Sequence, residues 1–563
     1  MGLKLFRTTG FATLPVGAAP TGQSAVRPPV LLVLASIWIA SVCNLALWRE
    51  FTRLPELANT RGVLFAVALG VVIAATTCAL LSLFAWRWTM KPVISLFLLA
   101  AAFGSYFMMA YGVVIDPTMM VNVLQTDPRE TRDLLNWRMG LSVLLLAVLP
   151  MLWLWRQPMP RIGVFKRLFW NATILIASCV VLAGTLAVSY KDISSVMRSH
   201  TQLRYLINPL NSFYALGVIA AKPWQLNTKV LLPVGEDARL GARYAEQPKP
   251  PLLLLVLGET ARSGNFAING YARPTTPQLA RANVVSLRNV WSCGTSTAAS
   301  VPCMFSHLGR EAFEARRNNY ENMLEVLERS GLAVLWINNQ TGCKGVCERT
   351  PNVTTPRADL PGLCAGGECF DEIMLKGLNA RIAAMPADGR ARGVVLVMHQ
   401  MGSHGPAYYK RSPPAFKAFM PECTSNALQA CPQEQVLNAY DNTILYTDHF
   451  LGLAINWLQV QEPQFATAML YVSDHGESLG ENNLYLHGLP YAIAPDVQKR
   501  VPWITWLSAS FEQRTGVRAA CLKQQLDTRY SHDNYFHSVL GLMDVQTRIY
   551  QRSLDVYAPC AGL

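Results

Sequence analysis

The hydrophobic and polar positions divide the chain into an apolar first third and a more polar remainder. Five long apolar runs occupy the first part, at residues 30–48, 62–86, 93–115, 141–155 and 169–190. At about 1.5 Å per helical residue, the run at 30–48 reaches about 28 Å, which is enough to cross a bilayer. A cleaved signal peptide would have a shorter apolar core. The pattern therefore predicts five transmembrane helices.

Basic residues in the connections predict the orientation of these helices. The connections after the second and fourth runs contain no acidic residue and carry Arg87, Lys91, Arg156, Arg161, Lys166 and Arg167. By the positive-inside rule these connections face the cytoplasm together with residues 1–29. An odd number of spans then places everything after residue 190 on the opposite side.

The polar remainder divides into two segments. Residues 191–250 mix apolar with basic residues and end in a stiff Pro-rich stretch, so we expect an interfacial connector along the membrane. Residues 251–563 repeat a pattern in which a short apolar run precedes a polar cluster, at 251–258, 333–337, 394–398 and 468–473. Amphipathic helices are predicted between these runs, at 319–330 and 435–458. This alternation predicts an α/β domain with a mostly parallel sheet.

Composition supports this division. The 563 residues are 51% hydrophobic and only 15% charged, which is too apolar for a purely soluble chain of this length. The formal net charge of +13 suits an anionic membrane surface or an anionic substrate. Nucleic acid is not expected as a partner, because no basic stripe with interleaved aromatic residues is present.

Ten of the 13 cysteines lie in the polar part of the chain. Their short spacings do not form the paired hooks of a structural zinc site and favour disulfides in an oxidising compartment. Neighbouring cysteines are expected to pair, and the last two remain for each other. The predicted pairs are Cys293 with Cys303, Cys343 with Cys347, Cys364 with Cys369, Cys423 with Cys431, and Cys521 with Cys560.

The stretch WSCGTSTAASVPCMF at residues 291–305 crowds small hydroxyl residues between two cysteines. The candidate nucleophiles are Thr295, Ser296, Thr297 and Ser300. The small neighbouring residues would let backbone amides approach an anionic group. A surface loop closed by a disulfide is the alternative interpretation of this stretch alone.

The polar clusters after the predicted strands should meet at one edge of the sheet, since ligands bind beyond the carboxyl ends of parallel strands. Glu259, Asp474 and His475, with a threonine oxygen from the loop, form a donor set suited to zinc or a similar divalent ion. Metal coordination would activate a weak hydroxyl nucleophile. Three basic or titratable residues at the same edge remain to bind phosphoryl oxygens or protonate a leaving group: Lys344, His404 and His487.

A second polar set lies between the third and fourth runs. Asn122, Thr126 and Glu130 have a spacing that places them on one face of a helix, unless Pro128 ends that helix. Such a stripe at a membrane surface could hold a lipid head group, and an ordinary solvated face is the alternative.

Four motifs resemble the phosphoethanolamine transferases that modify lipid A, a family that includes the mobile colistin-resistance enzymes. They read GETARSGNFAINGY, SCGTSTAASVPCMFS, HQMGSHGPAYY and YVSDHGESLGENNLYLHG. The resemblance implies a fold like that of alkaline phosphatase and sulfatases for residues 251–563, as a periplasmic catalytic domain. It also implies residence in the inner membrane as a monomer.

The same resemblance implies roles for individual residues. Thr297 would be the nucleophile, and Glu259, Asp474 and His475 would join it as ligands of one tightly bound Zn²⁺, with a second ion left open. Lys344, His404 and His487 would contact the substrate phosphate, and Asn122, Thr126 and Glu130 would contact the donor's head group.

The implied reaction moves phosphoethanolamine from phosphatidylethanolamine to a phosphate of lipid A through a covalent threonine intermediate. It would lower surface negative charge and confer resistance to polymyxins and cationic peptides. Transfer to a core sugar, a hydrolase of the same fold, transfer of phosphoglycerol, and an inactive sensing protein are the alternatives. No cysteine begins the C/S-x-P-x-R pattern that sulfatases require.

Overall fold

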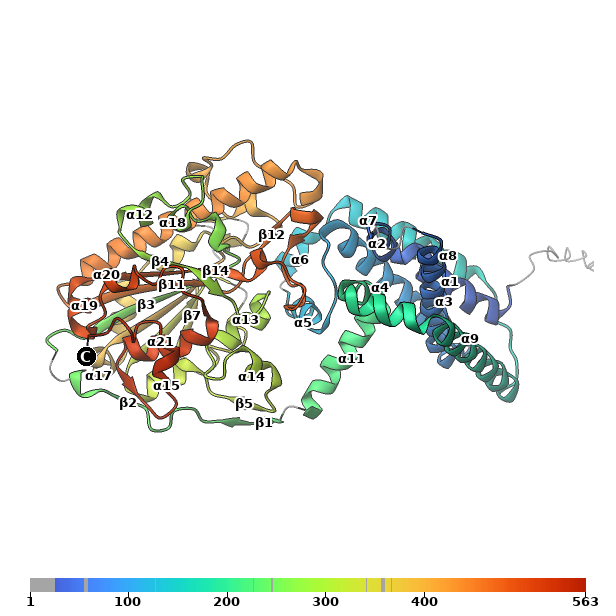
Figure 1. The fold of residues 1–563 in the computed structure, drawn as a ribbon, viewed down its shortest axis with the longest axis horizontal. Helices are drawn as coiled ribbons and strands as arrows, with labels where there is room; N and C mark the ends of the chain where they lie inside the picture. Colours follow the sequence, from blue (N-terminus) through green and yellow to red (C-terminus); the bar gives the residue numbers. More distant parts are fainter. Residues whose placement is uncertain are drawn as a thin grey trace, which may run out of the picture.

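The computed structural model describes residues 26–54, 59–126, 128–225, 227–244, 247–340, 342–355, 360–365 and 367–562. It confirms five apolar helices that are long enough to cross a membrane (Figure 1). They are Pro28–Thr52 (α1, η1 and α2), Thr60–Leu83 (α3), Met90–Tyr111 (α4), Trp137–Arg156 (α7, η3 and α8) and Val164–Ser199 (α9). Most of the predicted N-terminal segment 1–29 lies outside the described residues.

Helix α9 continues past residue 190 to Ser199, because no glycine or proline follows Gly184 to end it. The chain then forms α10 (Thr201–Tyr205) and α11 (Leu210–Gln225). Strand β1 (Asn227–Leu232) pairs with β5 (Asn318–Tyr320), and β2 (Arg239–Leu240) pairs with β16 (Val545–Gln546). The second half of the predicted connector therefore pairs with the α/β domain. Its predicted position along a membrane stays a prediction.

An eight-stranded sheet forms the centre of the α/β domain, in the order β15-β4-β14-β11-β3-β10-β6-β7. The four predicted apolar runs form its four central parallel strands: β3 (Pro251–Gly258), β6 (Ala333–Asn338), β10 (Val394–His399) and β11 (Ala466–Ser473). The remaining strands are β4 (Val285–Trp291), β7 (Asn352–Thr354), β14 (Arg500–Leu507), which runs antiparallel to β11, and β15 (Tyr530–Ser531). This confirms the α/β fold.

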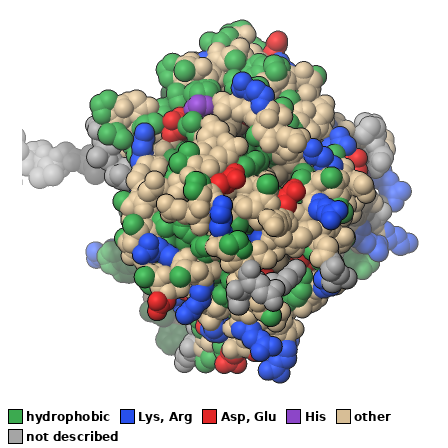
Figure 2. All heavy atoms as spheres, turned by 90° about the vertical axis from the view of Figure 1, so that its left-hand side faces the viewer, with side chains coloured by type: hydrophobic (Ala, Val, Ile, Leu, Met, Phe, Trp, Pro, Cys, Tyr) green, Lys and Arg blue, Asp and Glu red, His purple; other side chains and the backbone are tan. Residues whose placement is uncertain are grey.

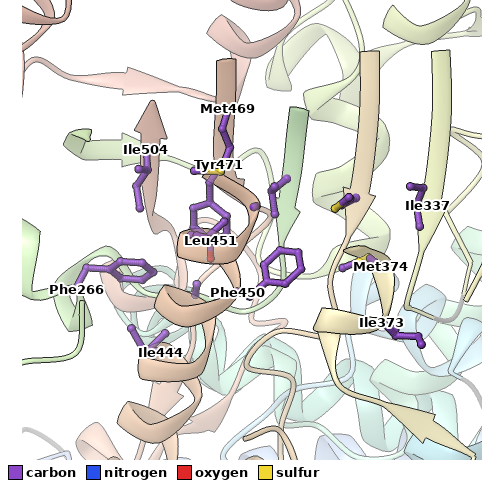
Figure 3. Close-up of a cluster of buried hydrophobic side chains, with 14 of the residues drawn as sticks. Phe266, Ile337, Ile373, Met374, Ile444, Phe450, Leu451, Met469, Tyr471 and Ile504 are labelled. Carbon is purple, nitrogen blue, oxygen red and sulfur yellow. The ribbon is translucent and has the colours of Figure 1, made fainter. Parts of the chain in front are cut away.

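Helices cover both faces of the sheet, which explains why its strands are continuously apolar. On one face, α18 (Gln433–Gln461) packs Ile444, Phe450 and Leu451 against the side chains of Met469 and Tyr471 (Figure 3). On the other face, α15 (Met323–Arg329) and α21 (Tyr535–Leu542) cover a second apolar cluster. The carboxyl ends of the strands are thereby held in fixed positions relative to one another.

The two predicted amphipathic helices are present with different bounds. Helix α18 extends the predicted helix 435–458 at both ends. The predicted helix 319–330 is wrong at its start, because residues 318–320 form strand β5 beside β1. Helix α15 begins only after Asn322, whose side chain accepts the backbone N–H of Leu324 in a capping box with Glu325.

The membrane helices contact the α/β domain through two short helices, α5 (Pro117–Gln125) and α6 (Pro128–Leu134) (Figure 1). Helix α5 packs against α13 (Thr297–Met304), which contains the predicted nucleophile loop. Figure 2 shows the opposite end of the molecule, where Lys and Arg side chains are spread over the face with acidic side chains between them. Because α5 packs against α13, the sheet edge with the polar clusters lies on the side of the membrane helices.

Five disulfides join the same cysteine pairs that the spacing predicts. They are Cys293–Cys303, Cys343–Cys347, Cys364–Cys369, Cys423–Cys431 and Cys521–Cys560. The remaining cysteines lie in the apolar helices as free thiols: Cys43, Cys78 and Cys179.

Candidate active site

Two neighbouring strands bring three candidate metal ligands together. Glu259 directly follows β3, and Asp474 and His475 directly follow β11, which is paired with β3. One ligand atom from each residue lies within 4.8 Å of the others, and all three residues are fully buried. The parallel pairing of β3 and β11 therefore produces the cluster that the sequence predicts.

Thr297 completes this cluster from the first position of helix α13. Its Oγ1 lies 3.2 and 3.3 Å from the two carboxylate oxygens of Glu259 and 3.4 Å from Nε2 of His475. At a helix N-terminus the backbone N–H groups are free of intrahelical partners and favour an anion. The Thr297 hydroxyl therefore lies both beside the candidate metal ligands and at a helix end that favours an anion.

The separations fit a tetrahedral metal ion. Ligand distances near 2.0 Å put the neighbouring ligand atoms of a tetrahedron about 3.3 Å apart. Oδ2 of Asp474 lies 3.3 Å from Nε2 of His475, and Oε1 of Glu259 lies 3.5 Å from the same nitrogen. Oδ2 of Asp474 is buried without a hydrogen-bond partner among the described residues, as an oxygen reserved for a cation would be.

Surrounding hydrogen bonds orient these ligands. Nδ1 of His475 lies 2.9 Å from the carbonyl of Gly476, so this nitrogen donates and Nε2 is left with its lone pair toward the cluster. Thr260 has a positive φ of 58° and donates its hydroxyl to Glu259 and its backbone N–H to Asp474. Gln340 donates to the second oxygen of Glu259 at 2.9 Å. No prediction from the sequence includes Thr260 or Gln340.

Two predicted phosphate contacts lie beside the cluster. The ring of His487 lies 4.2 Å from the ring of His475 and is tilted by 45° relative to it, and the ring of His404 lies 6.0 Å from that of His487. Burial lowers the pKa of His404 to about 4 and that of His487 to about 3. Both rings are therefore neutral near pH 7 and offer N–H donors rather than positive charge.

The other predicted contacts are less directly placed. Lys344 follows Gln340 along the chain and lines a cavity of about 240 Å³ together with Ser306 and Arg316. Asn122 lies in α5, which ends at Gln125 with Thr126 as an extended cap, and Pro128 starts a new helix. The predicted continuous stripe is therefore broken by Pro128, and the side chain of Glu130 lies outside the described residues.

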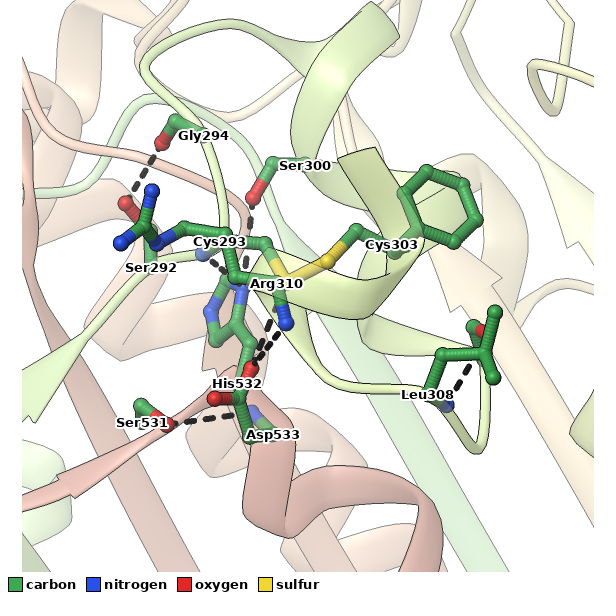
Figure 4. The surroundings of a disulfide bond; sticks show 12 residues. Ser292, Cys293, Gly294, Ser300, Cys303, Leu308, Arg310, Ser531, His532 and Asp533 are labelled. Atoms are coloured by element: carbon green, nitrogen blue, oxygen red, sulfur yellow. Dashed lines mark hydrogen bonds between the residues drawn. A yellow bond between two sulfur atoms is a disulfide. The ribbon is translucent and has the colours of Figure 1, made fainter. Parts of the chain in front are cut away.

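A buried histidine, for which no motif in the sequence predicts a role, fixes the nucleophile loop to the sheet. Nδ1 of His532 accepts the backbone N–H of Cys293 at 3.1 Å (Figure 4). Its Nε2 donates to the carbonyl of Ser473 at 3.0 Å. Ser300, one turn after Thr297, donates to the carbonyl of Asp474 at 2.5 Å. These contacts, with the Cys293–Cys303 disulfide, hold Thr297 against the ligands of β11.

A second missed residue is Glu477, which is fully buried two positions after His475. Burial raises its pKa well above the ordinary value, and its carboxyl lies 3.4 Å from Nδ1 of His487. The sequence does not predict the contact between Glu477 and His487, because a carboxylate ten residues from a histidine is common.

Family models match both parts of the chain. Residues 73–223 match a model described as phosphoethanolamine transferase EptA/EptB, and residues 251–545 match one described as sulfatase. The chain is 40% identical over 553 residues to phosphoethanolamine transferase EptA of Salmonella typhimurium, which covers 96% of this chain and 99% of that protein. It is 36% identical over 538 residues to phosphatidylethanolamine transferase Mcr-1 of Escherichia coli, which covers 93% and 96%.

Solved structures give the same result. The chain resembles the integral membrane lipooligosaccharide phosphoethanolamine transferase A (EptA) of Neisseria meningitidis with a TM-score of 0.88 and 33% identity, over 95% of this chain and 99% of that one. The soluble domain of the same protein matches with a TM-score of 0.55 and 39% identity, over 59% of this chain and 99% of that one. With five apolar helices, a sulfatase-like domain and these relatives, the chain belongs to the phosphoethanolamine transferase family.

Proposed function

We propose that this chain transfers phosphoethanolamine from phosphatidylethanolamine to a phosphate of lipid A through a covalent intermediate on Thr297. The observation that carries this proposal is the Thr297 hydroxyl, which lies against Glu259 and His475 at the N-terminus of α13. The names of the relatives support the donor and the transferred group. Membership of the family supports a site on the periplasmic side of the inner membrane.

In the first step, Oγ1 of Thr297 attacks the phosphorus of the donor. The Oγ1–P bond forms, the bond between phosphorus and the diacylglycerol oxygen breaks, and phosphoethanolamine stays on the enzyme. The proton lost by Thr297 ends on the diacylglycerol oxygen. Because His404 and His487 are neutral, either ring would first accept this proton at its unprotonated nitrogen and then donate it to the leaving oxygen. The N-terminus of α13 offers backbone N–H groups to the phosphoryl oxygens.

Glu259, Asp474, His475 and Thr297 would hold the metal ion in this proposal, with zinc as the ion that best suits the donor set. Zinc would lower the pKa of the coordinated hydroxyl and neutralise negative charge on the phosphoryl group. Of the three predicted phosphate contacts, Lys344 is the charged one, and it would bind a phosphoryl oxygen.

In the second step, an oxygen of a lipid A phosphate attacks the same phosphorus. The new P–O bond forms, the Oγ1–P bond breaks, and the proton of the acceptor phosphate returns to Thr297. The product carries an ammonium group on a former phosphate, so its net negative charge falls. Weaker binding of polymyxins and other cationic peptides follows from this loss of charge.

A sugar acceptor is the second candidate, because the chain is also 26% identical over 533 residues to an Escherichia coli protein named Kdo(2)-lipid A phosphoethanolamine 7''-transferase. Mass spectrometry of lipid A and of the core sugars, from cells with and without this chain, separates the two acceptors. A mass increase of phosphoethanolamine on lipid A itself is expected, and an increase confined to the core sugars would assign the second acceptor.

The intermediate is tested by incubating the full chain with phosphatidylethanolamine and no acceptor. Peptide mass spectrometry should locate phosphoethanolamine on Thr297, and Thr297→Ala should carry none. Ser296→Ala is a matched control, because Ser296 is the adjacent buried hydroxyl and has no hydrogen-bond partner among the described residues. Full transfer by Thr297→Ala, or an adduct that disappears only in Ser296→Ala, would reject Thr297 as the nucleophile.

A further inference from the structure

A group of four charged residues, none of them a candidate metal ligand, joins helix α6 to the α/β domain. Asp133 of α6 forms ion pairs with Lys410 and with Nη2 of Arg411, the second at 3.5 Å. Nη1 of Arg411 donates to Glu368 at 2.8 Å. The Asp133 and Arg411 side chains are only 8% and 4% exposed, so water screens this pair weakly.

Arg411 also contacts a residue of the candidate active site. Its Nε donates to the backbone carbonyl of His404 at 3.1 Å. A guanidinium group is planar and its N–H donors point in fixed directions, so the three partners of Arg411 restrict one another's positions. The position of His404 is thereby linked to Asp133, which lies on a segment between two membrane helices.

A second contact holds the same turn of α6. Asn426 donates its side-chain amide to the carbonyl of Asp133 at 2.7 Å, and Tyr111 at the end of α4 donates to the carbonyl of Asn426 at 3.2 Å. Asp133 is therefore fixed through its backbone as well as its carboxylate. Replacing that carboxylate alone would change the ion pairs and leave these hydrogen bonds.

We propose that Asp133 is a positioning residue of this enzyme, which acts through Arg411 to hold His404 in its place beside the substrate phosphate. This inference rests on the proposed function, in which His404 contacts that phosphate. It means that the catalytic arrangement is complete only when the segment between the third and fourth membrane helices is docked. Neutralising Asp133 removes one of the two carboxylates that pair with the buried Arg411, so the guanidinium would shift toward the remaining one, Glu368.

The test compares variants of the full chain in detergent micelles. Diacylglycerol release from phosphatidylethanolamine is measured in a single turnover without acceptor. Asp133→Asn and Arg411→Lys should each slow this step by about 10–100-fold, since small displacements of a catalytic group have effects of this size. The double variant should be no slower than the slower single variant, because both changes break the same link.

Lys410→Met is the matched control, because Lys410 pairs with the same carboxylate, whereas the hydrogen bond to the carbonyl of His404 comes from Arg411. It should slow the step much less than Asp133→Asn. For Asp133→Asn, the maximal rate should fall, and the donor concentration at half saturation should change little. The thermal unfolding midpoint of each variant is measured in parallel. If Arg411→Lys does not fold, the comparison of Asp133→Asn with Lys410→Met decides alone.

An unchanged rate for Asp133→Asn, an equal loss in Lys410→Met, or losses that multiply in the double variant would overturn the inference. The wild-type chain separates this failure from a failure of the proposed function. If wild type releases no diacylglycerol and gains no adduct on Thr297, both proposals are wrong. If wild type does both while Asp133→Asn matches it, only the role of Asp133 is wrong.

Discussion

Helix α9 and strand β3 are both strongly apolar, yet their surroundings are opposite. Val180 and Val188 of α9 are 64% and 89% exposed, whereas every residue of β3 from Leu252 to Leu257 is fully buried by protein. Length separates the two segments, since α9 contains a 28-residue apolar span and β3 has only eight residues. Apolar character therefore specifies removal from water, and the length of the segment indicates whether lipid or protein provides the cover.

The largest expected effect is a charge in the protein-covered segment. Leu255→Asp would bury a carboxyl group between two helix-covered faces, at a cost of at least about 5 kcal/mol, comparable to the whole stability of a domain. Protease resistance and yield of folded protein measure the loss. Val460→Asp, at a side chain that is 71% exposed on α18, is the control and should fold normally. A stable Leu255→Asp variant would contradict the buried position of β3.

A charge on the exposed face of α9 should cost less. Val180→Arg is expected to disfavour membrane insertion by about 3 kcal/mol, the cost of arginine at the centre of a membrane helix. The inserted fraction of the full chain measures this cost, and Val180→Leu is the control. If Val180→Arg inserts as well as wild type, then this face of α9 is not covered by lipid.

Metal removal should lower the stability of the α/β domain and leave that of the membrane helices unchanged. A ligand at about 100 times its dissociation constant stabilises the folded state by about 2.7 kcal/mol, so a chelator should lower the unfolding midpoint of the α/β domain. Added zinc should restore both the midpoint and transfer. In Asp474→Asn the chelator should have little further effect, and an unchanged midpoint in wild type would argue against a bound ion at Glu259, Asp474 and His475.

Polar groups inside the protein-covered region depend on distant partners. His532→Leu would leave the N–H of Cys293 and the carbonyl of Ser473 without partners, at a cost of about 1–3 kcal/mol in unfolding free energy. Transfer should also slow, because this contact holds the loop that carries Thr297. Chemical denaturation and single-turnover transfer measure the two effects, and His532→Leu with wild-type transfer would show that the loop is fixed by other contacts.

The smallest effect is expected for a hydroxyl on the lipid-covered helix. Thr185 donates to the carbonyl of Val181 within α9 at 2.8 Å, so its partner is supplied by its own helix. Thr185→Val should change stability by no more than about 0.6 kcal/mol, measured by unfolding in mixed micelles. A loss as large as that of His532→Leu would remove this distinction between the two regions.

The contacts that the sequence predicts well are local or follow from parallel strands. Glu259 and Asp474 each follow an apolar run directly, so the sheet topology alone brings them to one edge. The predicted helix 319–330 includes residues 319 and 320, which instead belong to β5, because β5 pairs with β1, a segment about 90 residues away. Tertiary pairing overrides local preference in such cases.

The missed residues share a different cause. His532 is 239 residues from its partner Cys293 in the sequence, and Gln340 is 81 residues from its partner Glu259. Neither residue belongs to a motif that would indicate its role. The stripe of Asn122, Thr126 and Glu130 failed as a single helix for a local reason, since Pro128 cannot continue a helix that begins at Pro117. Their predicted contact with a head group stays a prediction.

The order of the cysteines has a consequence for how the chain matures. Four of the disulfides close loops of 4 to 10 residues, and the fifth joins residues separated by 39. Each of these ten cysteines therefore pairs with a neighbouring cysteine along the chain, in the order in which they would emerge during export. An oxidant that joins cysteines in their order of appearance produces the native connectivity directly. We expect maturation to need no later exchange of sulfur partners.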